Sequence, residues 1–181
     1  GGKGDLVKEV RAATHAAGLE FAAYLSPWDR HHAEYARPAY VNYFHAQWAD
    51  LMDNYGPITE IWLDGANGGD GWYGGAKEKR KLPGGAEVYY KSGLLLETLF
   101  KKSKNAVAFS GYVTDRTVSW PFNEKGIVAE DYKFYRERDG KQYFCPPEAD
   151  TPLRRTWFWH KNDQAKPLQT LVHRYFESLG R

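Results

Sequence analysis

Asp64 is the residue of this chain best placed for covalent or acid–base chemistry. It follows Ile61, Trp62 and Leu63 directly, so a carboxylate comes at the end of an apolar strand and next to a large indole. In folds built from parallel strands and helices, reacting groups gather at the carboxyl ends of the strands. A carboxylate at such a position can act as a nucleophile or exchange a proton. The alternative is structural: Asp64 starts a turn with Gly65 or caps a helix.

The segments before Asp64 alternate between helix and strand. Asp5 is suited to cap the first helix, and Pro38 is suited to the first position of the second. Apolar residues at helical spacing mark both helices, whereas the strands are short apolar runs typical of buried parallel strands. The expected elements are a helix from Leu6 that ends at Gly18, a strand over 19–25, a helix over 38–55 and a strand over 58–63. Asp64 therefore lies where the second strand becomes a loop.

Beyond Asp64 the composition of residues 65–90 changes to Gly, Asn, Lys and Tyr, which predicts one long loop. Later elements are a helix over 94–100, a strand over 106–109, short strands near 118–120 and 143–144, and an amphipathic closing helix over 168–179. Residues 155–159 are a last strand or its terminal loop. Strands and helices that alternate in this way predict an α/β fold in which helices wrap a parallel sheet, as a barrel or a doubly wound sheet. No Gly-x-Gly-x-x-Gly follows a strand, which argues against a dinucleotide fold.

Length and charge narrow the possible classes. The 181 residues allow one domain with a core, but a closed eight-fold β/α barrel takes about 250 residues, and this chain begins without Met, so we expect a segment of a longer protein. The net charge is +2 and the basic residues are spread along the chain, so nucleic acid is not an expected partner. No apolar run reaches the roughly 18 residues that would cross a bilayer, so no membrane insertion is expected.

No metal site is expected. Cys145 is the only cysteine, so the chain can form no internal disulfide and no zinc site built on thiolates. His31 and His32 are adjacent, and adjacent side chains do not converge unaided on one ion. Aromatic residues make up 16% of the chain, which suits stacking on the apolar faces of sugars.

The stretch from Glu60 through Asp64 to Gly69, with the letters EIWLDGANGG, closely resembles the nucleophile strand of the α-L-fucosidases of glycoside hydrolase family 29. Further matches follow the order of that family along nearly the whole chain. They are Tyr24–Arg30, Asn54–Gly56, Asn123–Gly126, Trp157–His160 and Tyr175–Arg181. The resemblance implies that residues 1–181 are the C-terminal portion of a single catalytic (β/α)8 barrel. Nothing here matches the paired His motif of the family's earlier strands, so this barrel is expected to be incomplete, with its N-terminal strands missing from the chain.

The chemistry implied by the resemblance is hydrolysis of terminal α-linked L-fucose from glycans by double displacement, without metal or organic cofactor. Asp64 matches the family's nucleophile, and Trp62 matches the indole that lines the sugar pocket. Retention of configuration requires a second carboxyl group about 5 to 5.5 Å away, which protonates the departing oxygen. The expected partner is a fucosylated oligosaccharide or glycoconjugate. A periplasmic or secreted location follows from the resemblance, and the oligomeric state stays open.

Glu124 is the expected acid/base residue. Its context, Trp120–Gly126, looks like the Trp-x-Gly-Asn-Glu-x-Gly stretch of the branch that cleaves α-1,3 and α-1,4 linked fucose. Pro121 and Phe122 replace the usual apolar residue and Gly, and Ser119 stands where an Arg is common. Glu148 is the rival, because it also resembles a recurrent position of the family.

With Trp62 and Glu148, the residues Tyr24, Trp28 and Trp157 make up the expected substrate-binding set. The two indoles can stack on the C–H faces of a sugar or cover the methyl group of fucose. Two other functions stay open at this point. The same barrel could act on a related sugar such as galactose, or the chain could be a carbohydrate-binding protein without turnover.

Overall fold

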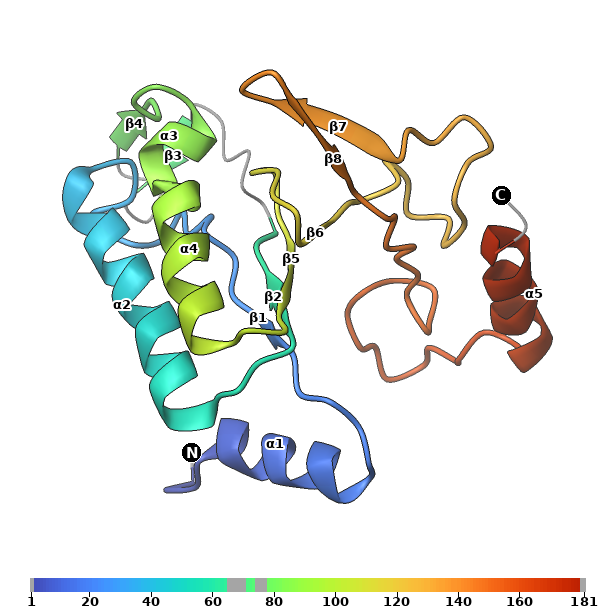
Figure 1. Ribbon diagram of the computed structural model, residues 1–181. Helices are drawn as coiled ribbons and strands as arrows, with labels where there is room; N and C mark the ends of the chain where they lie inside the picture. Colours follow the sequence, from blue (N-terminus) through green and yellow to red (C-terminus); the bar gives the residue numbers. More distant parts are fainter. Residues whose placement is uncertain (1, 65–70, 74–77, 180–181) are drawn as a thin grey trace. The chain divides into compact units, whose positions relative to one another are not determined.

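The computed structural model describes residues 2–64, 71–73 and 78–179, which divide into two compact units (Figure 1). The first unit runs from Gly1 to Tyr112 and the second from Val113 to Arg181. Part of the fucosidase-like stretch, Gly65 to Gly69, lies outside the described residues.

A parallel sheet packed against helices forms the first unit. Within this unit its strands are β1 (Ala23–Tyr24), β2 (Glu60–Trp62) and β5 (Val107–Phe109), which are neighbours in that order. Helix α2 (Pro38–Tyr55) connects β1 to β2, and α4 (Ser92–Lys102) lies between β2 and β5 in the chain. This β-α-β-α-β order confirms the predicted α/β fold with a parallel sheet.

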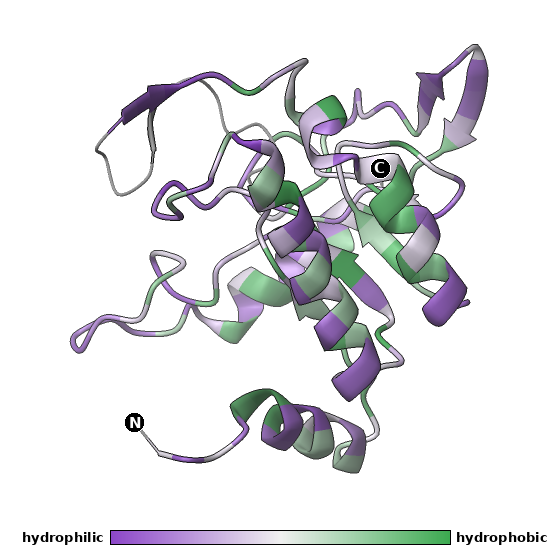
Figure 2. Ribbon diagram, turned by 90° about the vertical axis from the view of Figure 1, so that its left-hand side faces the viewer, coloured by the Kyte–Doolittle hydropathy of each residue, from purple (hydrophilic) through white to green (hydrophobic). Residues whose placement is uncertain are grey.

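The helices begin and end largely where the sequence predicts. Asp5 caps α1 (Leu6–Ala16) by accepting a hydrogen bond from the Lys8 backbone N–H at 3.0 Å, and Gly18 follows the helix with a φ of 72°. Pro38 takes the first turn of α2. The helices in Figure 2 carry hydrophilic and hydrophobic residues in alternating bands, as amphipathic helices do.

The core of the first unit lies between α2, α4 and the sheet. Every member is apolar or aromatic and less than a tenth exposed, so the helices are held by burial of their inner faces. From α2 come Tyr40, Val41, Phe44, Trp48 and Met52, from α4 Leu95, Leu96 and Leu99, and from the strands Ile61 and Ala108.

The first strand is shorter and more exposed than predicted. Only Ala23 and Tyr24 of the expected 19–25 run are strand, and Leu19 and Tyr24 are 64% and 59% exposed, so burial on both faces is wrong. β1 is the first strand in the sheet order, with β2 as its neighbour, and among the described residues of the first unit no strand pairs with its other edge. Backbone pairing nevertheless continues past the strand, because the Leu25 N–H donates to the Trp62 carbonyl at 3.1 Å.

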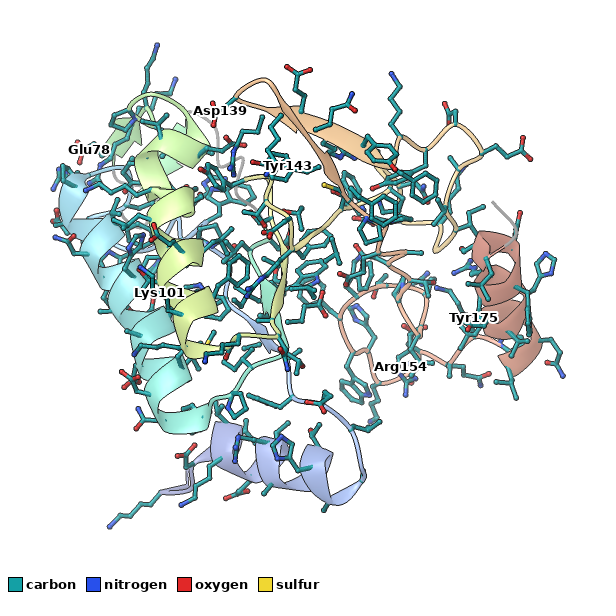
Figure 3. All side chains as sticks on the ribbon, viewed as in Figure 1. Glu78, Lys101, Asp139, Tyr143, Arg154 and Tyr175 are labelled. Carbon is teal, nitrogen blue, oxygen red and sulfur yellow. The ribbon has the colours of Figure 1, made fainter. Side chains whose placement is uncertain are left out.

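The single loop predicted for residues 65–90 is also wrong. It contains β3 (Gly71–Tyr73), which pairs antiparallel with β4 (Glu78–Arg80), and the short helix α3 (Ala86–Tyr90). Arg80 fastens β4 by donating to the Ala33 and Tyr35 carbonyls at 2.7 and 2.6 Å. It also pairs with Glu78 at 2.7 Å, and Glu78 is labelled in Figure 3.

The second unit has a short strand, a hairpin and a helix. β6 (Thr117–Val118) is followed by a parallel bridge between Ser119 and Pro147. β7 (Tyr135–Arg138) and β8 (Lys141–Phe144) form an antiparallel hairpin, of which only β8 was predicted. Asp139 and Gly140 make its turn with φ of 53° and 73°, the left-handed pair that two-residue hairpins favour; Asp139 is labelled in Figure 3.

The C-terminal part of the second unit has little regular structure before its last helix. Residues 155–159 form no strand, so of the two alternatives for this segment the loop is observed. Helix α5 (Leu168–Leu179) is present as predicted, and its apolar residues except Leu171 are exposed.

Candidate active site

Three aromatic rings line one face of the parallel sheet, one each from β1, β2 and β5. The strand register pairs Tyr24 with Trp62 and Trp62 with Phe109, so their side chains point to the same face. The Tyr24 and Trp62 rings stack with centroids 5.3 Å apart, and the Trp62 and Phe109 rings with centroids 3.8 Å apart. We call Tyr24, Trp62 and Phe109 the ring row. Phe109 was not predicted as a site residue, since only the register of β2 with β5 reveals it.

Asp64 is held beside this ring row by two hydroxyl groups. The Tyr24 hydroxyl donates to Asp64 Oδ2 at 2.6 Å, and the Ser26 hydroxyl donates to the Asp64 main-chain carbonyl at 2.6 Å. Asp64 comes two residues after Trp62, so the strand alternation brings its side chain to the face that carries the rings. The residue is exposed, and its carboxylate is therefore accessible to a ligand. Tyr24, Trp62 and Asp64, all predicted from the sequence, are brought together.

Tyr24 keeps its proton under all ordinary conditions. Partial burial, followed by the hydrogen bond to Asp64 and the negative charge of that carboxylate, raises the pKa of Tyr24 to about 12. Its hydroxyl is therefore a permanent donor to Asp64 near neutral pH.

Ser26 connects Asp64 to the loop that carries Trp28. While its hydroxyl donates to Asp64, it also accepts a hydrogen bond from the Trp28 backbone N–H at 3.1 Å. Trp28 is 43% exposed, and the Arg30 guanidinium lies 5.9 Å from its ring centroid. The neighbouring Pro27 carbonyl accepts from Tyr40 of α2 at 2.8 Å. Ser26 was not singled out in the sequence, although a serine just after a predicted strand is a common source of such local hydrogen bonds.

Glu124 lies in a tight loop of the second unit. The Asn123 side chain donates to the Pro121 and Ile127 carbonyls at 3.1 Å each and accepts from the Lys125 N–H at 3.0 Å, which closes the loop around Glu124. The Glu124 carboxylate is exposed and accepts a hydrogen bond from the Trp157 indole N–H at 3.3 Å. Glu124 and Trp157, predicted separately, therefore meet in the structure.

The rival carboxylate, Glu148, is half-buried in the same unit. Its backbone N–H donates to the Ser119 carbonyl at 2.9 Å, and the Ser119 N–H donates to the Pro146 carbonyl at 2.9 Å. Glu148 thus lies beside the residue that leads into Trp120 and the Glu124 loop. Asp64 belongs to the first unit and both glutamates to the second, so the spacing of the two reacting carboxylates remains a prediction.

A small pocket lies on the other side of β2. Among its lining residues are Phe44 and Tyr90 from the helices and Leu63 and Ser110 from the ends of β2 and β5. Leu63 is one residue from both Trp62 and Asp64, so it points away from the ring row and toward the helices. This pocket belongs to the helix-facing side, and the exposed carboxylate of Asp64 faces the other way.

Within residues 2–64, 71–73 and 78–179, no three His, Cys, Asp or Glu side chains are grouped so that they could hold a metal ion. In the same part of the chain, none of the helices combines the length and hydropathy needed to cross a bilayer.

Comparisons with known proteins agree on one family. Residues 1–180 match the family described as alpha-L-fucosidase. Alpha-L-fucosidase 1 of Arabidopsis thaliana is 31% identical over 198 residues, and a relative from Oryza sativa subsp. japonica is 32% identical over 198 residues. A crystal structure of a glycoside hydrolase 29 family member from an unknown rumen bacterium matches 99% of this chain with a TM-score of 0.82 and 38% identity. The chain covers 36%, 35% and 35% of these three proteins, so it spans about a third of their length.

Proposed function

This chain belongs to the α-L-fucosidase family, glycoside hydrolase family 29, and from that membership we propose that it carries the nucleophile of a retaining exo-α-L-fucosidase. The observation that supports this most strongly is the setting of Asp64. An accessible carboxylate lies at the carboxyl end of β2, accepts a hydrogen bond from Tyr24 and stands beside the ring row. The whole polypeptide is proposed to be one (β/α)8 catalytic barrel, with residues 1–181 as its C-terminal portion.

The proposed reaction has two steps. In the first, the Asp64 carboxylate attacks the anomeric carbon of fucose while the glycosidic C–O bond breaks and the departing oxygen takes a proton from a second carboxyl group. In the second, that carboxylate removes a proton from water, the water oxygen attacks the anomeric carbon and Asp64 is released. Two inversions at the same carbon retain its configuration.

Four residues of the first unit near Asp64 have a role in this proposal. Tyr24 orients the nucleophile through Oδ2, and Ser26 fixes the main chain of Asp64. Trp62 offers an apolar surface to the C–H face or methyl group of fucose. Trp28, from the loop that Ser26 holds, is the proposed side wall of the pocket. No step requires a metal or organic cofactor.

Glu124 is the proposed acid/base residue, with Glu148 as the alternative. Two features favour Glu124: its carboxylate is exposed, and a positioned donor, the Trp157 indole, binds one of its oxygens. The substrate class proposed is a fucosylated oligosaccharide or glycoconjugate with α-1,3 or α-1,4 linked fucose, and the proposed location is periplasmic or extracellular.

Azide rescue in the full-length polypeptide tests the nucleophile. Asp64→Ala should abolish hydrolysis of an aryl α-L-fucoside, and added azide should restore turnover with formation of the inverted glycosyl azide, because a small anion replaces the missing carboxylate. Asp53→Ala is the matched control, since Asp53 is an exposed Asp of the same unit whose carboxylate pairs with Lys102. Full activity in Asp64→Ala would refute the assignment.

The same logic separates the two glutamates. Glu124→Ala should lose most of its kcat/KM on substrates with poor leaving groups and little of its kcat/KM on an activated aryl fucoside. Azide, which replaces water in the second step, should then give a product with retained configuration. Glu148→Ala should not show this pattern. The reverse result would transfer the acid/base role to Glu148.

A further inference from the structure

Phe122 has a backbone conformation that costs energy for its residue type. Its φ is 61°, in the left-handed region. Among the described residues, the other non-glycine positions with positive φ are Ala36, Lys91 and Asp139, so Phe122 is the aromatic one. A bulky L-residue is strained in this region, and such strain concentrates at functional sites.

The surrounding loop imposes this conformation. Asn123 closes the loop with three hydrogen bonds, and Gly126 has a φ of 75°. A Cβ at position 126 would lie 2.4 Å from Thr151 Cβ, so the loop needs glycine at this position both for its φ and for space. A glycine at position 122 would adopt the required φ without strain, yet the chain has Phe there.

Burial does not offset the strain, because Phe122 is 66% exposed. The ring is nevertheless held in place. The Arg136 guanidinium from β7 lies 4.9 Å from its centroid, and the Trp120 ring packs against it with centroids 5.8 Å apart. The loop therefore presents a fixed aromatic ring that remains largely accessible to solvent.

The position of this ring in the chain points to the leaving group. Phe122 precedes Glu124 by two residues, so their Cα atoms are at most about 7 Å apart. In the proposed function Glu124 protonates the departing oxygen, which belongs to the unit that carries fucose and not to fucose itself. Aromatic rings offer a flat apolar surface, and the C–H face of a pyranose is its natural partner.

We propose that Phe122 is a specificity-determining residue that stacks on the first sugar of the leaving group. This inference rests on the proposed function. It assigns the leaving-group side of the site a preference for a pyranose over a small or linear aglycone. Arg136 and Trp120 act as positioning residues, because they hold the ring where the sugar would lie.

Two substrates that share fucose and differ in leaving group test this inference in the full-length polypeptide. One is α-L-fucosyl fluoride, whose leaving group has no ring, and the other is a trisaccharide with fucose linked to a pyranose. Phe122→Gly should lower the ratio of kcat/KM for the trisaccharide to that for the fluoride by roughly tenfold, the lower range of what one apolar contact contributes to specificity. Phe122→Leu should lower it similarly, since it keeps the strain and removes the flat ring.

The control is Phe144→Leu, which removes a 54% exposed ring from β8 and should leave the ratio unchanged. Thermal unfolding adds an independent readout: Phe122→Gly should melt at the same or a higher temperature than the wild type, because the strain is relieved. An unchanged ratio in both Phe122 variants would overturn the inference, whether the two kcat/KM values stay the same or fall equally. If the wild type hydrolyses neither substrate, the proposed function itself fails.

Discussion

The hydrogen bond from Tyr24 to Asp64 makes Tyr24→Phe the most direct test of how the proposed nucleophile is positioned. The substitution removes one hydroxyl, which lies 2.6 Å from Asp64 Oδ2, and keeps the ring that stacks on Trp62. Hydrogen bonds to charged groups contribute about 1.5–3 kcal/mol. Because Tyr24 is 59% exposed, water replaces part of the lost interaction, and the lower end of that range applies. Since about 1.4 kcal/mol corresponds to a factor of ten in rate, kcat/KM should fall about tenfold.

The assay is steady-state hydrolysis of an aryl α-L-fucoside by the full-length polypeptide, with thermal unfolding measured in parallel. Tyr55→Phe is the matched control. Its hydroxyl donates to Asp5 Oδ2 at 3.0 Å, so it removes the same kind of Tyr–Asp hydrogen bond at the junction of α1 and α2. Tyr55→Phe should leave kcat/KM unchanged. If Tyr24→Phe keeps wild-type kcat/KM, or if both variants lose activity to the same extent, Tyr24 does not position the proposed nucleophile.

Three further predictions follow from single contacts. Ser26→Ala removes a hydroxyl with two hydrogen bonds and should lower both kcat/KM and the free energy of unfolding, the latter by about 1 kcal/mol. Ser26→Thr keeps the hydroxyl and should keep most activity, and wild-type kinetics in Ser26→Ala would contradict this prediction. The pKa of Tyr24, raised to about 12 partly by the carboxylate, should fall toward 10 in Asp64→Asn, because the negative charge that disfavours the phenolate is gone. NMR of tyrosine labelled at Cζ measures this pKa, and an unchanged value would show that burial alone is responsible. Gly126→Ala should lower the free energy of unfolding by about 1–3 kcal/mol through strain and a steric clash, and by more than Gly140→Ala, whose new Cβ has nothing within 4 Å; urea unfolding of both variants decides, and equal losses would mean that only the positive φ matters.

Local sequence rules were sufficient for the helices and for the place of Asp64. Asp5 and Pro38 mark the starts of α1 and α2, and the apolar run before Asp64 becomes β2, because capping, proline geometry and burial act over a few residues. The hydrogen bond from Tyr24 to Asp64 was beyond such rules. It depends on the register of two strands whose residues lie 40 positions apart.

The strands that the sequence did not predict have charged or Gly- and Lys-rich compositions in place of apolar runs. β7 reads Tyr-Arg-Glu-Arg, with three charged residues, and only the Asp139–Gly140 turn at its end indicates a hairpin. The hairpin of β3 and β4 lies in a Gly- and Lys-rich region, and its stability comes from Arg80 bonding to carbonyls more than 40 residues away. Neither hairpin is marked by apolar periodicity in the sequence.

The contact between Trp157 and Glu124 is another feature that local sequence patterns did not predict. Trp157 was predicted as a wall of the sugar pocket, and the structure adds that its indole N–H reaches a carboxylate 33 positions earlier in the chain. Such a contact follows from how two loops of the second unit fold together, and each loop alone gives no indication of it.

The ring row belongs to the sheet and not to the loops around it. Backbone pairing between β1, β2 and β5 sets the positions of Tyr24, Trp62 and Phe109, so the surface they form does not depend on the length or sequence of the segments that follow. Those segments can therefore change in evolution while the aromatic surface of the sheet is inherited intact, and under the proposed function such changes would alter which glycans are accepted above that surface.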